Sequence, residues 1–132
     1  MAVVIDASAA VAWLLQEQTK AVHVERHLGA GMRAPALWVD EVANALVVAQ
    51  RAGRRAPAVT RALLAQASLL GVGLCGSPGM TRIAELAIES SLTAYDAEYL
   101  HLALDRGASL LTLDQQLADA ARSRGVTVLG AR

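Results

Sequence analysis

The 132-residue sequence predicts an α/β fold with a mainly parallel β-sheet. Two observations lead to this prediction. Short apolar runs recur along the chain, and they alternate with longer stretches of helical periodicity. Strands that alternate with helices in this way typically pair in parallel, with the helices packed on the sheet. Hydrophobic residues make up 55 % of the chain, so residues 1–132 are expected to bury a sizeable core as a single domain.

The expected strands are short and mostly apolar. Val3-Val4-Ile5 ends in Asp6 and a helical pattern follows at once, as expected for a buried parallel strand. Pro35 marks the edge or the end of the next strand, because proline cannot donate to a sheet ladder. The expected strands span residues 3–5, 34–36, 72–75, 109–113 and 126–129.

The intervals between these strands carry helical patterns with start and stop signals. Pro57 suits a first helical turn, and Gly107 and Gly125 suit helix ends. The helix at residues 94–106 is apolar nearly all round, so we expect it to be buried. Two helices within residues 37–70 follow each other with no strand between them. The expected helices span about residues 7–17, 20–28, 37–52, 57–70, 77–90, 94–106 and 115–124.

Charge and cysteine content narrow the possible functions. The formal net charge is zero, so there is no overall electrostatic attraction to nucleic acid, although a local basic patch remains possible. Cys75 is the only cysteine, which excludes an intramolecular disulfide and a cysteine-based zinc site and fits a reducing cytoplasm. The N-terminus does not resemble a signal peptide, and no apolar stretch is long enough to suggest a membrane span. We therefore expect a soluble cytoplasmic protein that does not bind membranes.

Four carboxylates occupy comparable places in the predicted fold. Asp6 and Asp114 each follow a strand, so both should lie at the carboxyl edge of a parallel sheet, where open α/β folds place their sites. Asp96 lies in the first turn of a helix, and Glu41 lies early in another, among apolar neighbours. Each also has a simpler interpretation. Asp6 and Asp114 suit helix N-caps, Asp96 suits a capping box with Thr93, and Glu41 suits a solvated helix face.

If the four acids converge on one edge, they repel one another strongly unless a cation neutralises them. No Lys or Arg flanks any of them as an obvious partner. An all-oxygen, carboxylate-rich site suits Mg²⁺ or Mn²⁺ rather than zinc. Such ions can activate a water and stabilise an in-line phosphoryl displacement, which is the chemistry of phosphodiester hydrolysis.

Two further groups of residues have both a functional and a structural interpretation. Ser8 and Thr112 suit hydroxyls that support the metal site, and equally well ordinary cap and strand hydroxyls. Arg54 and Arg55 belong to a local basic cluster with Arg51 and Arg61. This cluster is either a solvated turn or a rim that contacts RNA phosphates independently of base sequence.

Four motifs, taken in order, resemble those of the PIN-domain family, and most closely the VapC-type toxins of toxin–antitoxin pairs. The resemblance covers essentially the whole chain. The motifs are Val4-Ile5-Asp6-Ala7-Ser8, Glu41-Val42-Ala43-Asn44-Ala45-Leu46, Tyr95-Asp96-Ala97-Glu98-Tyr99-Leu100 and Leu111-Thr112-Leu113-Asp114-Gln115-Gln116-Leu117.

This resemblance implies a Mg²⁺- or Mn²⁺-dependent ribonuclease with a five-stranded parallel sheet between helices. The four acids of the family fall on Asp6, Glu41, Asp96 and Asp114, and its small hydroxyl residues near the metal fall on Ser8 and Thr112. The resemblance also implies a homodimer, a tRNA or rRNA substrate, and a cognate antitoxin whose C-terminal tail fills a groove beside the active site. Asp40 is an alternative to Glu41, but Glu41 shares a helix face with Leu37, Ala45 and Val48, whereas Asp40 lines up with Asn44. Glu41 is therefore expected to point inward.

Competing functions explain the sequence less well. A response-regulator receiver domain needs a lysine after a late strand, and the only lysine is Lys20, in an early helix. A haloacid-dehalogenase-like phosphatase needs two Asp separated by one residue, whereas Asp6 is followed by Ala7-Ser8. Two alternatives within the family stay open, a housekeeping PIN-domain nuclease and a catalytically idle module that binds RNA or a partner; the complete set of acids argues against the second.

Overall fold

A five-stranded parallel sheet forms the centre of the protein, as the sequence predicts. The computed structural model describes residues 2–29, 31–53 and 55–131. The strand order is β3-β2-β1-β4-β5, and every neighbouring pair is parallel. The strands are β1 (Val3–Ile5), β2 (Met32–Pro35), β3 (Gly73–Cys75), β4 (Ser109–Thr112) and β5 (Val128–Gly130).

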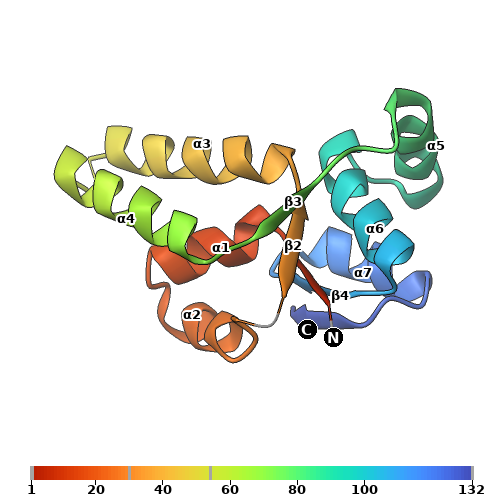
Figure 1. The fold of residues 1–132 in the computed structure, drawn as a ribbon, viewed down its shortest axis with the longest axis horizontal. Coiled ribbons are helices and arrows are strands. Elements are labelled where there is room, and N and C mark those ends of the chain that lie inside the picture. The colour runs from red at the N-terminus through yellow and green to blue at the C-terminus, as the bar shows by residue number, and fades with distance from the viewer. Residues whose placement is uncertain (1, 30, 54, 132) are drawn as a thin grey trace.

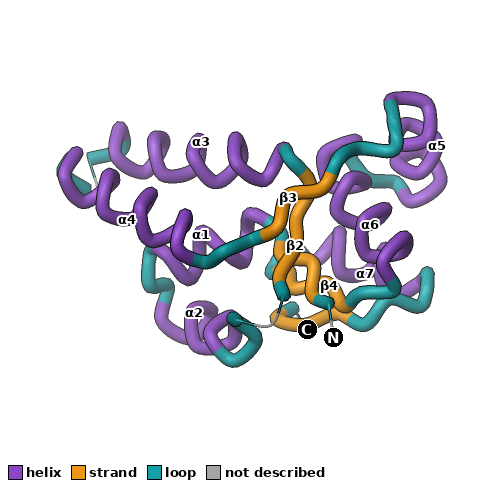
Figure 2. Tube along the Cα trace, viewed as in Figure 1, coloured by secondary structure: helices purple, strands orange, loops and turns teal. Residues whose placement is uncertain are grey.

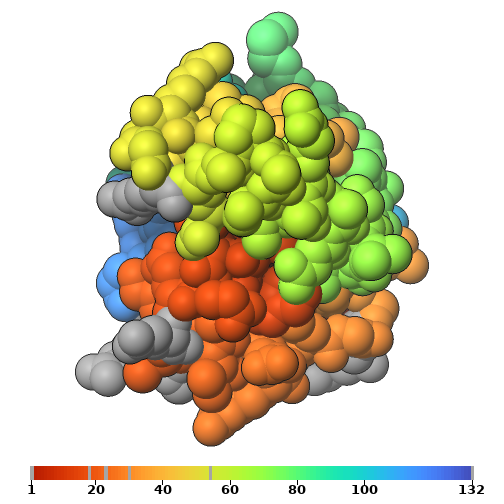
Figure 3. Space-filling model, turned by 90° about the vertical axis from the view of Figure 1, so that its left-hand side faces the viewer, coloured from red at the N-terminus to blue at the C-terminus, as the bar shows by residue number. Residues whose placement is uncertain are grey.

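Helices cover both faces of the sheet and give a three-layer α/β/α arrangement (Figures 1 and 2). The four helices on the left in Figure 1 form one layer, whose outer surface faces the viewer in Figure 3. The three helices on the right form the other layer. The first layer contains α1 (Ala7–Leu14), α2 (Gln18–Glu25), α3 (Leu37–Arg51) and α4 (Pro57–Leu69), and the second contains α5 (Met80–Ser90), α6 (Ala94–Arg106) and α7 (Gln115–Ser123). No helix among residues 2–29, 31–53 and 55–131 is long and apolar enough to cross a membrane.

The chain reverses its direction across the sheet next to β1. From β1 the chain moves outward to β2 and β3, and it then crosses to β4 and β5 on the other side of β1. Val4 pairs with Leu110, and Ile5 pairs with Leu111, so the carboxyl ends of β1 and β4 lie side by side. In open α/β sheets, this reversal point is where ligands bind.

The two central strands are buried completely. Val4, Ile5, Leu110 and Leu111 expose none of their surface, because helices pack on both faces of the sheet. A fully buried side chain of this size stabilises the fold by about 1.5–3 kcal/mol. The acids that follow these strands are therefore attached to the most rigid part of the fold.

Some element boundaries differ from the sequence prediction. The second strand starts at Met32, two residues earlier than expected, and the expected helix at residue 77 starts only at Met80. The Ser77 hydroxyl oxygen accepts a hydrogen bond from the N–H of Gly79, and Gly79 has a positive φ of 113°, so this segment forms a turn. Pro35 is the last residue of its strand, in agreement with one of the two positions predicted for it.

The expectation that the 94–106 helix is buried was wrong for both of its ends, because Asp105 and Arg106 in the last turn are exposed as well as the start of the first turn. Leu100, Leu102 and Ala103 are buried, but Ala94 is exposed and Tyr95 exposes 66 % of its surface. The first turn of α6 lies at the carboxyl edge of the sheet, where no further layer covers it. This exposed turn also carries Asp96.

Candidate functional site

All four predicted acids lie at the carboxyl edge of the sheet. Asp6 directly follows β1, and Asp114 is the second residue after β4. Glu41 is in the second turn of α3, which begins just after β2, and Asp96 is in the first turn of α6. Their charges act on one another: Asp114 raises the pKa of Asp6 and of Asp96, and Glu41 raises that of Asp96. The sheet thus gathers acids from four separate segments of the chain.

Asp6 is the most buried of the four, with 4 % of its surface exposed. Its Oδ1 accepts hydrogen bonds from the hydroxyl of Ser8 at 2.6 Å and from the N–H of Ala9 at 3.0 Å. Its Oδ2 accepts a hydrogen bond from the hydroxyl of Thr112 at 2.6 Å. A buried carboxylate is costly unless donors surround it. Asp6 therefore caps α1, as the simpler interpretation held, and also stands at the centre of a hydrogen-bond network.

The two hydroxyls connect Asp6 to the loop that carries Asp114. The Ser8 oxygen accepts the N–H of Leu113 at 3.1 Å, and the Thr112 oxygen accepts the N–H of Asp114 at 3.0 Å. Each hydroxyl accepts from the backbone, so its own proton is directed at Asp6. This chain of bonds fixes the β4–α7 loop relative to the start of α1.

The remaining helix caps also place acids at the edge. Asp114 caps α7 by accepting the N–H of Leu117 at 3.0 Å, and the hydroxyl oxygen of Thr93 accepts the N–H of Asp96 at 3.1 Å. The predicted caps at Asp6, Asp114 and Thr93 are thus present in the structure. A cap at the amino end of a helix and a place at the carboxyl edge of the sheet are compatible, because these helices start where their strands end.

Glu41 makes a contact that the sequence analysis did not predict. The hydroxyl of Tyr99 donates a hydrogen bond to its Oε1 at 2.6 Å, although Tyr99 exposes only 1 % of its surface. Glu41 is half-buried, whereas Asp40 is exposed, as helix phase predicts. The same prediction was wrong for Val48, which exposes 54 % of its surface because no other element covers that part of α3. Tyr99 lies three residues after Asp96 and so shares its helix face. A buried tyrosine in that position needs a polar partner, which is the signal that could have identified it.

Two of the acids hold their protons unusually strongly. Burial raises the pKa of Asp6 from 3.8 to about 6; hydrogen bonds from Ser8, Thr112 and Ala9 oppose this rise, and the charge of Asp114 adds to it. Burial, and after it the charges of Asp114 and Glu41, together raise the pKa of Asp96 from 3.8 to about 6, against an opposing hydrogen bond with Thr93. Perturbed carboxylates that influence one another at a sheet edge are typical of functional sites.

An open cleft of about 460 Å³ runs along this edge. Ser8, Glu41 and Asp114 line it together with apolar side chains of α1 and α3. Lys20 also lines the cleft, but its ammonium group pairs with Glu17 at 3.5 Å. The ion pairs among the described residues include none of the four acids. The acids therefore lack a cationic partner from within that part of the chain.

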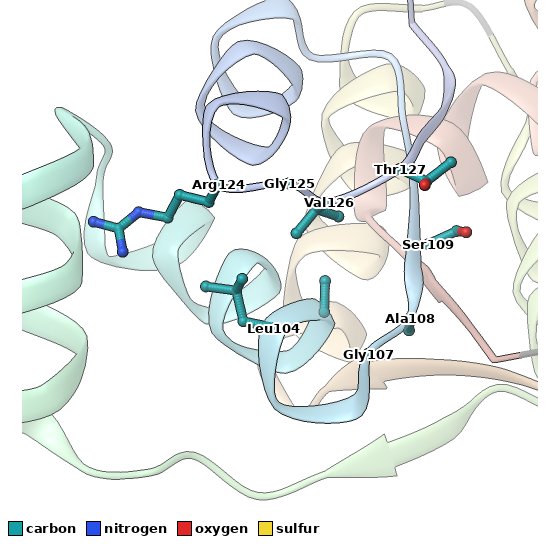
Figure 4. A pocket seen from close by; sticks show the side chains of 9 residues that line it. Leu104, Gly107, Ala108, Ser109, Arg124, Gly125, Val126 and Thr127 are labelled. Atoms are coloured by element: carbon teal, nitrogen blue, oxygen red, sulfur yellow. The ribbon is translucent and has the colours of Figure 1, made fainter.

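A second pocket, of about 220 Å³, lies at the opposite edge of the sheet, near the start of β4 (Figure 4). No acid lines it, and its one charged lining residue, Arg124, extends away from the other labelled side chains and pairs with Glu89 at 3.0 Å. The chemistry-bearing side chains are therefore concentrated at the carboxyl edge.

The donor set of the four acids fits a hard divalent cation. Carboxylate oxygens are the ligands that Mg²⁺ and Mn²⁺ prefer. Within residues 2–29, 31–53 and 55–131, however, no three Asp, Glu, His or Cys side chains already form a metal-ligand cluster. Repulsion between like charges and the cap hydrogen bonds of Asp6 and Asp114 account for this spread arrangement. The acids gather around one place, and an ion would have to draw their oxygens closer.

The structure describes only one of the two predicted RNA-binding arginines. Arg54 lies outside the described residues. Arg55 is half-buried, and its Nη2 donates to the carbonyl oxygen of Leu15, at the end of α1, at 3.3 Å. Its Nε is buried without a hydrogen-bond partner. Arg55 thus connects the α3–α4 turn to α1, and its contact with RNA stays a prediction.

Replacing Asp96 with Asn should stabilise the metal-free protein at pH 7. The pKa of Asp96 is higher in the folded protein than in the unfolded chain, so the ionised carboxylate lowers the free energy of unfolding. This penalty is absent below pH 3.8, where Asp96 is protonated in both states, and complete above about pH 6. The expected gain at pH 7 is on the order of 1 kcal/mol, after discounting for solvent screening of this half-buried group. Urea unfolding in EDTA should show the gain of Asp96→Asn over wild type growing from pH 4 to pH 7.

The matched control is Asp105→Asn, which removes an exposed carboxylate of the same helix, and the gain of Asp96→Asn at pH 7 should exceed that of this control. An Asp96→Asn variant that is no more stable than wild type at pH 7 would contradict the proposed charge repulsion.

Comparisons with known proteins agree with this fold. The PIN domain model matches residues 3–123. The structure is similar to the crystal structure of PAE2754 from Pyrobaculum aerophilum, with a TM-score of 0.75 and 24 % identity, over 97 % of this chain and 83 % of that one. It is also similar to a PilT N-terminus domain protein, SSO1118, from the archaeon Sulfolobus solfataricus P2, with a TM-score of 0.55 and 17 % identity, over 97 % and 85 % of the two chains.

These two likenesses show the fold, since both identities are low. No curated protein matches the chain. The family match itself covers all four acids and most of the chain. PIN domains are commonly nucleases and typically use divalent metals. By its sequence match and its fold, the chain belongs to the PIN-domain family.

Proposed function

We propose that this chain is a Mg²⁺- or Mn²⁺-dependent endoribonuclease and the toxin of a toxin–antitoxin pair. The observation that carries the nuclease part is the placement of four acids from separate segments at one sheet edge, with none of them in an ion pair among the described residues. Carboxylates that perturb one another in this way are typical of sites that bind a cation or carry out a reaction. The open cleft supports a substrate that is held locally at the site.

Asp6, Glu41, Asp96 and Asp114 would hold the ion. When bound, Mg²⁺ or Mn²⁺ supplies an activated water and neutralises the charge that develops on the phosphodiester. The chain's own contribution is to orient the acids. Ser8 donates to one carboxylate oxygen of Asp6 and Thr112 to the other. Because Thr112 is the last residue of β4, these bonds hold the Asp6 carboxylate next to the end of that strand. The N-caps fix the backbone that carries Asp96 and Asp114.

The toxin role, its RNA and its partners are part of the proposal. The support is the resemblance of the four motifs to VapC-type toxins, which implies tRNA or rRNA as substrate, a homodimer and an inhibitory antitoxin.

Asp6→Ala and Asp96→Asn should each reduce Mg²⁺-dependent cleavage of total RNA by on the order of a hundredfold or more, since each removes charge from the site that stabilises the reaction. EDTA should abolish the wild-type activity, and added Mn²⁺ should restore it. Sequencing of RNA ends would measure cleavage and identify the target.

The control for that experiment is Asp40→Asn, on the exposed neighbour of Glu41. Unchanged cleavage by either site variant would refute the site assignment. A wild-type protein that binds RNA without cutting it in the presence of Mg²⁺ would favour the idle binding module.

Expression of the wild-type chain in a bacterial host should arrest growth, and Asp6→Ala should relieve the arrest, because toxicity would depend on cleavage. Colony counts after induction provide the measurement. Robust cleavage in vitro together with normal growth would instead favour a housekeeping nuclease.

A further inference from the structure

The contact between Tyr99 and Glu41 joins two layers of the fold. Tyr99 belongs to α6 and Glu41 to α3, and these helices lie on opposite sides of the sheet (Figure 1). Their side chains meet beyond the carboxyl edge, with 2.6 Å between the hydroxyl oxygen and Oε1 of the carboxylate. The two residues are 58 positions apart in the sequence. No helix cap or turn explains this bond, so its role has to be sought in the site.

Tyr99 is a rigid donor. It is among the largest fully buried side chains, with 1 % of its surface exposed, and it packs within the main hydrophobic core. A packed ring has only two side-chain torsions, whereas glutamate has three and would otherwise sample several rotamers. The bond therefore fixes the flexible partner to the rigid one.

The surroundings of the Tyr99 hydroxyl keep it protonated. Burial raises its pKa strongly, and the hydrogen bond to Glu41 and the charges of Glu41 and Asp6 raise it further, against an opposing hydrogen bond from the N–H of Ala7. The hydroxyl is thus close to the start of α1 as well as to α3. A tyrosine hydroxyl, with an ordinary pKa of about 10, is protonated at physiological pH and can donate.

We propose that Tyr99 is a positioning residue of the metal site, which occupies Oε1 of Glu41 and presents Oε2 to the cleft as a single-oxygen ligand. Glu41 itself lines the cleft, so the remaining oxygen has access to it. The proposal rests on the proposed function, because it assigns a role to a neighbour of one of the four acids. Residues that orient metal ligands in this way typically contribute about 10–100-fold to metal affinity.

The test compares Tyr99→Phe with Tyr95→Phe. Tyr99→Phe removes only the hydroxyl, and Tyr95 is an exposed tyrosine one turn earlier on the same helix. Mn²⁺ affinity, measured by electron paramagnetic resonance, should fall roughly tenfold or more for Tyr99→Phe and stay unchanged for Tyr95→Phe. At saturating metal, kcat should fall while the KM for RNA stays within twofold.

Glu41→Gln separates positioning from a general effect on folding. Where Glu41 is already Gln, adding Tyr99→Phe should cause little further loss of Mn²⁺ affinity, because the carboxylate ligand that Tyr99 orients is then absent. Equal losses with and without Glu41 would contradict the proposal, as would wild-type Mn²⁺ affinity in Tyr99→Phe. If the wild type neither binds Mn²⁺ nor cleaves RNA, the proposed function itself fails.

A second measurement does not depend on the folding of Tyr99→Phe. The chain has two tyrosines, so Tyr95→Phe leaves Tyr99 as the only one. Ultraviolet resonance Raman spectroscopy of this variant reports the hydrogen bonding of the Tyr99 hydroxyl. Saturation with Mg²⁺ should shift the tyrosine bands, because an ion on Oε2 weakens Oε1 as an acceptor, and Glu41→Gln should abolish the shift. Bands that do not respond to Mg²⁺ in a variant that binds the ion would overturn the proposal.

Discussion

The carboxylate of Asp6 is the interaction on which the rest of this site depends. It is buried at the end of the central strand, and three donors surround it: the hydroxyls of Ser8 and Thr112 and the N–H of Ala9. These bonds satisfy the carboxylate in the folded protein without a counter-charge. They also connect β1, α1 and β4 at the point where the sheet reverses direction. The carboxyl edge is thus built around a charge that the fold holds in place, although burial raises its pKa to about 6.

The four acids at this edge lower the stability of the fold, although the proposed function requires them. Burial contributes most to the raised pKa of Asp96, and the charges of Asp114 and Glu41 make it still harder to ionise. A chain selected only for stability would replace one of these acids with an amide. The retention of all four, with no basic side chain paired to them in the described part of the chain, is physically reasonable if a divalent cation completes the site. The rigid core beneath the edge provides the stability that opposes this repulsion.

Much of this arrangement was predictable from the sequence, because it depends on local signals. Asp6 and Asp114 follow apolar strands, and parallel strands bring their carboxyl ends to one edge. Helix phase also correctly predicted that Glu41 is more buried than Asp40. The contact of Tyr99 with Glu41 was not predicted, because it joins residues 58 positions apart and depends on how two helices approach over the sheet end. The exposure of the first turn of α6 was not predicted for a similar reason. The composition of a helix shows how apolar it is, but the elements packed around the helix determine which of its turns are covered. The half-buried position of Arg55 against Leu15 likewise follows from tertiary packing, which a count of basic residues cannot reveal.

The central claim is that four acids from separate segments form one site for divalent cations. Anomalous diffraction from a crystal grown with Mn²⁺ at pH 7 tests it most directly. We expect a peak at the carboxyl edge of the sheet. Oxygens of Asp6, and of at least two of Glu41, Asp96 and Asp114, should coordinate the ion at roughly 2.1 Å or contact it through its bound waters. A crystal that holds Mn²⁺ only elsewhere on the surface, with these four side chains still apart, would contradict it.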